Sequence, residues 1–557
     1  MRPWVLLPLL FACSEPTVGR PPRDWSPPTL HVSSPARGTL HPGLAPVEVR
    51  GRVTDEGLGI AGVTVNGVAA EVGADGSFHA TLTPVPGINL IQTRVTDGEG
   101  NPRSETRALL AGDLQPVEGM LPDALMLRLD REALRVIGEL ARRTVAETDF
   151  YALLAKENPL VNAAAPCFAA RVELRRLSVG GVELALTPVG GGVELHATLS
   201  DIAVGFHVKY EAFCKNDEGE VSFTTERFRL DGKLALSLGD GGKITADASQ
   251  TVAAFDRFVW GGDVLPARVR ELLDQPLADA LAVLIAGEVS KRVPALITRR
   301  VDGKPRTTEV RGEELVMALR PAALLADDRG LAFALDSSIY VSGAPGTVFP
   351  RTPAAPPALD AEATRGLRLA IADDALNQLL ASLWGAGVFD QDLDIEQTDR
   401  LEQLGLVFDH LSFVPRLPPV AEAMPNGGGL RLTAGDVECQ LVQRPEGLPP
   451  RVVARVVVSL RVTVVASVVD DRLMLRPMAP ELFVDVPLEP GDPPSPLHEE
   501  SLRALGDFVT DNLVTLLGEV VSGVPLPGLD ELSIVDARAG SPPAGGYLEL
   551  VGDVRLR

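Results

Sequence analysis

Three aspartates alternate along one acidic stretch, and carboxylates at this spacing could bind a metal ion. Asp390, Asp392 and Asp394 match the first three ligand positions of a calcium-binding loop, in which carboxylate oxygens surround the ion. Such a loop needs glycine at its sixth position for a sharp turn, but Ile395 stands there. We therefore interpret the stretch as a solvated acidic loop, with a calcium site as the weaker alternative.

A glycine-rich stretch and the histidines are the other candidates for chemistry. Gly57 to Gly62 match the spacing of a dinucleotide-binding turn, but that turn must open a helix, and the strand-like Val63–Val65 follows instead. The seven histidines are scattered, with none paired at the spacing of metal ligands. G-x-S-x-G, H-E-x-x-H and Walker sequences are missing. We expect a protein that is not an enzyme and that has no metal and no cofactor.

A cysteine near the N-terminus could carry a lipid. The apolar run Val5 to Phe11 is far shorter than the roughly 18 residues needed to span a bilayer. Leu10-Phe11-Ala12-Cys13 is similar to a bacterial lipobox, in which the cysteine becomes an acylated N-terminus. We expect a signal peptide over residues 1–12 and a lipid anchor on Cys13. A plain signal peptide with an incidental Cys13 is the alternative.

The residue after Cys13 predicts a location. Ser14 follows Cys13, and an aspartate at this position would have argued against the outer membrane. In this the chain resembles Gram-negative outer-membrane lipoproteins. We therefore expect a protein anchored by lipid to the cell outer membrane. Residues 13–27 are rich in proline and polar residues, as in a tether.

Three further cysteines remain, and export permits a disulfide between two of them. Cys439 shares the apolar side of an alternating strand with Val437 and Leu441, so we interpret it as a small core residue. This leaves Cys167 and Cys214 as the expected pair.

The overall charge excludes one class of partner. The chain has 557 residues and a formal net charge of -23, with 45% hydrophobic and only 4% aromatic residues. Phosphate contacts need concentrated Lys and Arg, so we expect no nucleic acid partner. At roughly 100–200 residues per domain, the length suggests three or four domains with cores of Val, Leu and Ala.

Short strands and turns dominate residues 28–112. Val47, Val49 and Val53 alternate with polar residues, and Asn66-Gly67 is a strong hairpin signal. We expect an immunoglobulin-like β-sandwich here.

The rest of the chain repeats itself. "GEVSKRVPAL" at Gly287 and "GEVVSGVPLP" at Gly518 share one skeleton at the end of an apolar helix. An earlier segment recurs at an offset of 242 residues, where Leu127, Leu129, Glu132, Ala133, Leu134 and Ile137 correspond to Leu369, Ile371, Asp374, Ala375, Leu376 and Leu379. We expect a tandem duplication with units at 113–343 and 361–557, joined by a Pro-rich linker at 344–360.

One strand of the second unit is unusually long. Apolar residues alternate from Val452 to Val468, whereas a usual strand has about 5–6 residues. Arg455 and Arg461 exclude a membrane-spanning helix. A strand of this length suits a long twisted sheet around a helix, or an elongated apolar groove.

The C-terminal residues resemble a known family. Gly523 to Leu529, with Tyr547 to Leu550, is similar to the C-terminal signature of the bactericidal/permeability-increasing protein, lipopolysaccharide-binding protein and lipid-transfer protein family. Asp373 to Phe389 resembles the opening helix of that family's second domain. The resemblance covers about 113–557.

The resemblance implies an α+β, mostly β fold: two tandem tubular lipid-binding domains, each a long helix wrapped by strongly twisted antiparallel sheets. It also implies pockets for acyl chains and one disulfide in the first domain. The expected lipid-binding residues lie on two helix stripes and on the long strand: Leu134, Ile137, Ala141, Leu376, Leu379, Leu380, Leu383, Trp384, Val456, Val458 and Leu460. Each of these could instead be ordinary core.

We therefore expect a protein that binds or transfers phospholipid-like or lipopolysaccharide-like ligands. One departure from the family is that its antibacterial members are strongly basic, whereas this chain is acidic. Basic residues do gather from Lys291 to Arg311, as a solvated edge or as a contact for lipid headgroups. The alternative function is a non-catalytic surface scaffold or adhesin that acts through its immunoglobulin-like domain.

Overall fold

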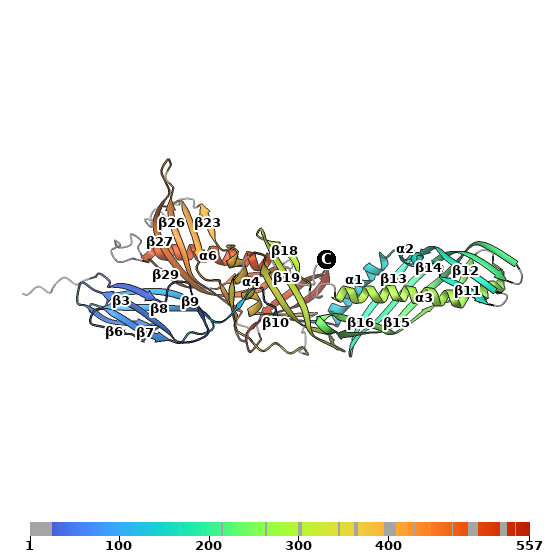
Figure 1. Ribbon diagram of the computed structural model, residues 1–557, viewed down its shortest axis with the longest axis horizontal. Helices are drawn as coiled ribbons and strands as arrows, with labels where there is room; N and C mark the ends of the chain where they lie inside the picture. The colour runs from blue at the N-terminus through green and yellow to red at the C-terminus, as the bar shows by residue number, and fades with distance from the viewer. Residues whose placement is uncertain are drawn as a thin grey trace, which may run out of the picture.

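The protein is dominated by β-structure. The computed structural model describes residues 25–557, except 166–167, 213–214, 262–264, 299–303, 344–345, 361–365, 395–407, 427–428, 445, 470–471, 479, 488–498, 524–531 and 541. Of these described residues, 58% lie in strands and 19% in helices. The molecule is elongated, with the N-terminal unit at one end and a long curved sheet at the other (Figure 1).

The N-terminal unit is a sandwich of two sheets. The first sheet has the order β1 (Thr29–Ser34), β3 (Val47–Thr54), β7 (Ser77–Leu82), β6 (Glu71–Val72). The second has the order β2 (Thr39–Pro42), β9 (Pro102–Pro116), β8 (Gly87–Asp97), β4 (Ile60–Val65), β5 (Val68–Ala69). Its core alternates with solvent-facing residues along each strand and includes Val49, Val95 and Leu109.

The expected hairpin turn is present in this unit. Val65 pairs with Val68, and both Asn66 and Gly67 between them have positive φ, +47° and +80°. Asn and Gly are the residues that tolerate this conformation, which a two-residue hairpin of this type requires.

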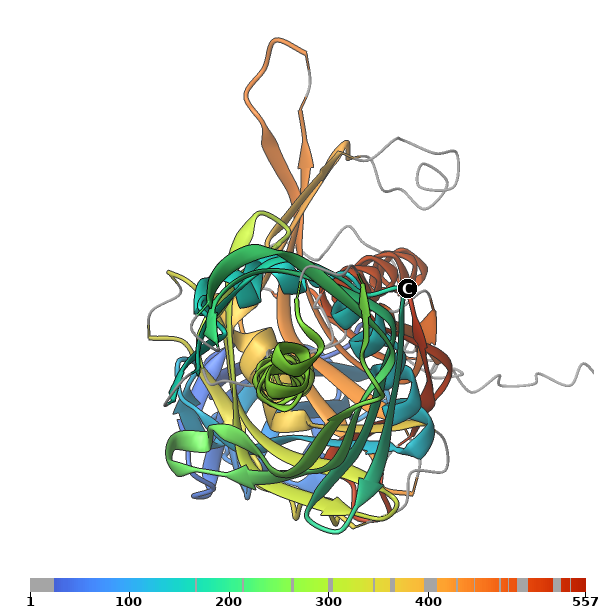
Figure 2. The same cartoon turned by 90° about the vertical axis from the view of Figure 1, so that its right-hand side faces the viewer.

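A seven-stranded sheet forms the opposite end. Its strands are β11 (Val161–Ala165), β12 (Phe168–Ser178), β13 (Gly181–Val189), β14 (Gly192–Ala212), β15 (Lys215–Leu238), β16 (Ile244–Phe255) and β17 (Val259–Gly261). The helices packed on it are α1 (Arg131–Ala146), α2 (Phe150–Leu154) and α3 (Ala267–Thr298). Figure 2 looks along α3, which runs on the concave side of the curved sheet.

A 14-stranded sheet joins the two repeats. Its main path is β18 (Arg306–Val310), β19 (Glu313–Asp327), β20 (Gly330–Val341), β10 (Leu121–Asp130), β22 (Leu367–Ala372), β31 (Tyr547–Leu556), β30 (Leu532–Gly540), β27 (Arg451–Val469), β26 (Leu430–Gln443), β24 (His410–Pro415) and β23 (Gln391–Asp394). The strands β25 (Val420–Ala423), β28 (Arg472–Pro477) and β29 (Glu481–Asp485) are attached to it, with the helices α4 (Asp373–Gly385) and α6 (Glu499–Gly523).

The repeats meet at two equivalent strands. β10 and β22 pair antiparallel with Leu127 opposite Leu369, the two residues that correspond at the offset of 242. Equivalent residues that face each other across an antiparallel pair are related by a local twofold axis. The internal repeat in the sequence is therefore expressed as symmetric pairing.

The fold class expected from the family resemblance is wrong. We expected two tandem tubular domains, each a long helix wrapped by its own strongly twisted sheet. Instead β10 and β18–β20 of the first unit share one 14-stranded sheet with the strands of the second unit, whereas β11–β17 form a separate sheet. The opening helices α1 and α4 have only 16 and 13 residues. The longest helix, α3, buries one stripe and exposes its other side. Open sheet edges carry unpaired main-chain groups, and β10 and β22 satisfy theirs by pairing across the units.

The Pro-rich linker packs closely on the molecule. Its strand β21 (Val348–Arg351) pairs with the end of β9, with Phe349 opposite Gln115. Further along, the carbonyl oxygen of Leu359 accepts a hydrogen bond of 3.0 Å from Arg128. The linker therefore covers the outer face of the sheet where the two repeats meet.

Candidate functional site

The predicted second-domain stripe lies in the interior. Leu376, Leu379, Leu380 and Leu383 of α4 are all buried. The polar residues of the helix are buried as well, so that α4 has no solvent-facing side from Asp373 to Leu383. It contacts β10, β20, β21, β22 and β25. The stripe thus packs against the protein's own side chains, and a role in binding lipid stays a prediction.

Buried amides explain why α4 occupies this place. Gln378 donates to the carbonyl oxygens of Val117 (2.7 Å) and Gly119 (2.6 Å), and its own oxygen accepts from the N–H of Ile339 (3.0 Å). Asn377 exchanges two hydrogen bonds with the backbone of Ala421. These side chains satisfy main-chain groups that no strand partner reaches, which a buried segment requires. Sequence reasoning named the four leucines and Trp384 of α4 as binding residues, but neither of these amides.

Two carboxyl groups stand at the start of α4. Burial raises the pKa of Asp373 to about 7, against the hydrogen bond that it accepts from the N–H of Ala423 (3.2 Å). Burial likewise raises the pKa of Asp374, whose carboxylate accepts from the N–H of Thr352 (2.8 Å). Both carboxyl groups therefore accept hydrogen bonds from backbone N–H groups of neighbouring segments.

The predicted stripe of the first unit is also core. Leu134, Ile137 and Ala141 are buried on α1, which packs on β13 and is capped by the carboxylate of Asp130. Capping satisfies two N–H groups of the first turn.

The three residues named on the long strand are buried too. Val456, Val458 and Leu460 lie on β27 with no exposed surface. The opposite side of the same strand is covered in its middle, where Val457 and Ser459 are buried. Strands β26, β27 and β29 contact β9 there, so the N-terminal sandwich supplies the cover. The other predicted residue, Trp384, is half-buried and donates to the carbonyl oxygen of Pro415 (2.7 Å).

An aromatic cluster, which sequence reasoning missed, lies on the seven-stranded sheet beside α3. It comprises Phe206, Phe223, Phe228, Phe255, Phe258 and Trp260. The rings of Phe223 and Phe258 stack with centroids 4.1 Å apart, and Trp260 Nε1 donates to Asp274 of α3 (2.6 Å). Three members, Phe255, Phe258 and Trp260, are only half-buried. The sequence feature that could have revealed this cluster is the aromatic-rich stretch Phe255 to Trp260, which stands out in a chain with only 4% aromatic residues.

Apolar side chains reach the surface on the same elements. α3 buries Val269, Leu273, Leu277, Leu281, Ile285, Val289 and Val293 against the sheet. On its outer side Leu272 is 46% and Val283 is 70% exposed, and their spacing of 11 residues puts them on one side of the helix. Val252 of β16 and Val259 of β17 are also exposed, but they alternate with the inward-facing Ala253 and Trp260 and so lie on the side of the sheet away from α3. We call Leu272 and Val283 the α3 apolar face.

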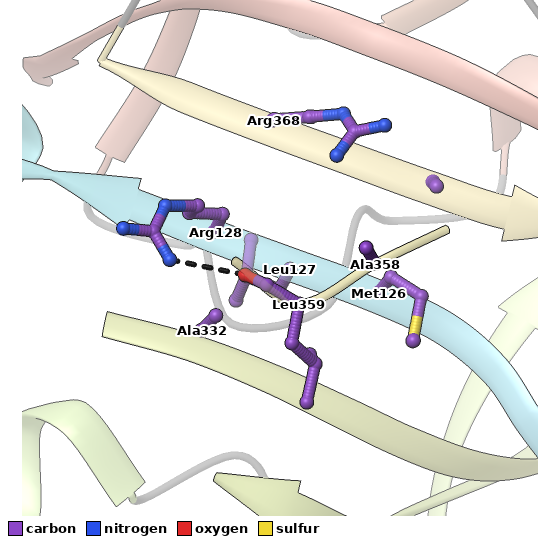
Figure 3. A pocket seen from close by; sticks show the side chains of 8 residues that line it. Met126, Leu127, Arg128, Ala332, Ala358, Leu359 and Arg368 are labelled. Atoms are coloured by element: carbon purple, nitrogen blue, oxygen red, sulfur yellow. Dashed lines mark hydrogen bonds between the residues drawn. The ribbon is translucent and has the colours of Figure 1, made fainter. Parts of the chain in front are cut away.

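Two cavities near the named residues are not apolar tubes. A cavity of about 10 Å³, room for one water molecule, lies under the linker between Met126, Arg128, Leu359 and Arg368 (Figure 3). A depression of about 390 Å³ between α1, α2 and α3 has a polar lining that includes Glu147, Asp149 and Arg292.

The acidic stretch lies against a buried histidine. Asp392 and Asp394 lie 3.2 Å and 3.1 Å from the two ring nitrogens of His410, which is itself buried. Within the ranges that the structure covers, no group of three or more His, Cys, Asp and Glu could hold a metal ion. In the same ranges no helix is both long and apolar enough to cross a membrane.

The cysteines divide into two groups. Cys13, Cys167 and Cys214 lie outside the described residues. Cys439 is a buried free thiol, and burial raises its pKa to about 12, so it is a poor nucleophile.

Comparisons with known proteins bear on the N-terminal unit most directly. Residues 28–112 match the family model described as glucodextranase, domain B. No curated protein matches this chain. The solved structure of lipopolysaccharide binding protein is similar at 14% identity and a TM-score of 0.40, over 78% of this chain and 99% of that chain. The structure of latherin is similar at 13% identity and a TM-score of 0.17, over 31% of this chain and 95% of that chain. The fibronectin(III)-like modules of Clostridium thermocellum CbhA are similar at 9% identity and a TM-score of 0.14, over 34% of this chain and 92% of that chain. The expected immunoglobulin-like domain is confirmed in the N-terminal sandwich.

Proposed function

We propose that this chain is a non-enzymatic lipoprotein of the cell outer membrane that binds phospholipid-like or lipopolysaccharide-like ligands by their acyl chains. The observation that supports this most is the α3 apolar face beside an aromatic cluster with half-buried rings. Each methylene that leaves water gains about 0.8 kcal/mol, so a chain of about 14 methylenes gains roughly 11 kcal/mol from contact with apolar groups alone. Binding of this kind needs no catalytic residue.

The proposal predicts that charges on the α3 apolar face remove lipid without unfolding the protein. Leu272→Asp with Val283→Asp should leave the melting temperature within a few degrees, because surface substitutions cost about 0.5 kcal/mol or less. The variant should lose most of the acyl-chain lipid that co-purifies with the parent chain, since a carboxylate opposes apolar contact. Native mass spectrometry of the two proteins measures the bound lipid.

Leu58→Asp is the matched control, because Leu58 is 72% exposed on the immunoglobulin-like domain, away from α3. This variant should keep its lipid. Equal lipid in all three proteins would contradict the role of α3. Lipid-free protein throughout would favour the alternative, a surface scaffold acting through the immunoglobulin-like domain, with which the match over residues 28–112 is compatible. Released fatty acid would indicate an enzyme instead.

The anchor gives a second prediction. Replacing Cys13 by alanine should remove the chain from the outer-membrane fraction, because acylation needs the thiol. Fractionation and intact-mass measurement of the parent and the variant check this. An unchanged distribution, together with no acyl mass on the parent chain, would rule the anchor out.

The disulfide gives a third. We expect Cys167 and Cys214 to be joined, because Phe168, next to Cys167, pairs with Ala212, two residues before Cys214, across β12 and β14. Peptide mapping without reductant should recover this bridge and an unmodified Cys439. A bridged peptide containing Cys439 would contradict the assignment.

A further inference from the structure

The hairpin between β26 and β27 ends in an apolar tip. The strands project beyond the body of the molecule (Figures 1 and 2). Residues 446–453, with the sequence EGLPPRVV, are all exposed, and five of the eight are apolar. Leu448 is 66% exposed, and Val452 and Val453 are exposed nearby. No other six-residue stretch in the described part of the chain exposes three large aliphatic side chains.

The shape of the tip is fixed by its backbone. Gly447 has a φ of +75° with open space around it, so the turn is made away from the body. Pro449 and Pro450 restrict the segment that follows. A stiff apolar tip loses little conformational entropy when it is buried, which favours a contact made by few residues.

The charges at the tip do not oppose a membrane surface. Glu446 and Arg451 give residues 446–453 no net charge in a chain of net charge -23, and Arg444 just before them lies 3.5 Å from Asp394. The Arg451 side chain can extend to lipid headgroups while the aliphatic side chains lie deeper. The tip is too small for a protein partner, because a stable interface buries about 800 Å² on each side and centres on aromatic anchors, which are missing from residues 446–453.

We propose that residues 446–453 dock into the interfacial layer of a phospholipid bilayer. The proposal rests on the proposed function, which places the chain at a membrane through its lipid anchor. A few apolar side chains are enough to hold the tip at the membrane, because the lipid anchor already keeps the chain there. Docking of the tip is then an intramolecular step and not a separate binding event from solution. Docking would hold the body in one orientation on the membrane.

The test uses the full chain with Leu448→Cys labelled by an environment-sensitive fluorophore. Cys439 does not compete, because it is buried with a raised thiol pKa. With vesicles of phosphatidylethanolamine and phosphatidylglycerol, we expect a blue shift at position 448 and about a twofold quenching by lipids brominated on their acyl chains. Leu58→Cys, labelled in the same way, should show neither change.

Two results would overturn the proposal. The first is the same emission at positions 448 and 58 with vesicles present. The second is a blue shift at position 448 without vesicles, which would assign the tip to a second copy of the chain. The outcome is independent of the lipid that co-purifies with the α3 apolar face, because that lipid is measured on separate variants by mass.

Discussion

Arg37→Met is expected to lower the free energy of unfolding by about 3–5 kcal/mol, because it removes the cation from a cluster of buried carboxylates. Arg37 lies 2.8 Å from Asp436, 3.2 Å from Glu105 and 3.7 Å from Asp485. Arg37 and Glu105 belong to the immunoglobulin-like domain, whereas Asp436 and Asp485 belong to β26 and β29 of the body. The substitution would leave Glu105 and Asp436, one from each side, facing each other without a cation between them.

The same substitution should loosen this interface in a way that amide exchange can locate. Asp485 accepts from the N–H of Thr106 (2.9 Å) and Asp436 from the N–H of Ala108 (2.9 Å), both on β9. These two amides should exchange faster in Arg37→Met, while amides in the sandwich core stay protected. Arg50→Met is the control, since the Arg50–Glu48 pair is exposed and should matter little. Equal stability of the two variants would contradict the role of Arg37.

Local signals in the sequence predicted several elements well. The Asn66-Gly67 turn and the alternation of residues 28–112 indicated the N-terminal sandwich, which is present. The repeat at an offset of 242 matched Leu127 with Leu369, and these two residues pair across β10 and β22. The duplication of the whole units stays a prediction. The alternation that begins at Val452 indicated one long strand, and β27 spans Arg451–Val469. The turn depends on the backbone preferences of two adjacent residues, and the alternation reflects which side of a strand is buried, so neighbouring residues determine both.

The sequence could not show which surfaces cover one another. Alternation in β27 is lost at Val457 and Ser459 because a distant sandwich buries the outer side as well. Gln378 is buried by three main-chain partners from β20 and the segment before β10, and no pattern in the helix sequence identifies partners so far along the chain. The shared sheet likewise depends on pairing between strands about 240 residues apart, for which a single sequence carries no local signal.

The other large effect expected is a loss of stability as the pH rises from about 4 to about 7. Burial raises the pKa of Asp373 to about 7 and that of Asp485 to about 7, both from 3.8. A raised pKa means that the folded protein holds the proton more tightly than the unfolded chain does. The stabilisation by each neutral carboxyl is therefore complete below pH 3.8 and is lost as the pH rises through 7. A difference of about three pH units corresponds to at most about 4 kcal/mol for each group.

Asp373→Asn isolates one of these groups. The amide oxygen of asparagine can still accept from the N–H of Ala423, but no charge forms at high pH. Urea unfolding should therefore find the variant more stable than the parent at pH 8, by up to about 4 kcal/mol, and no more stable at pH 4. Asp240→Asn, at an exposed position, controls for the loss of one negative charge. If Asp373→Asn and the parent lose stability equally between pH 4 and pH 8, then Asp373 is ionised throughout. The start of α4 would in that case hold a charge that its main-chain donors alone stabilise.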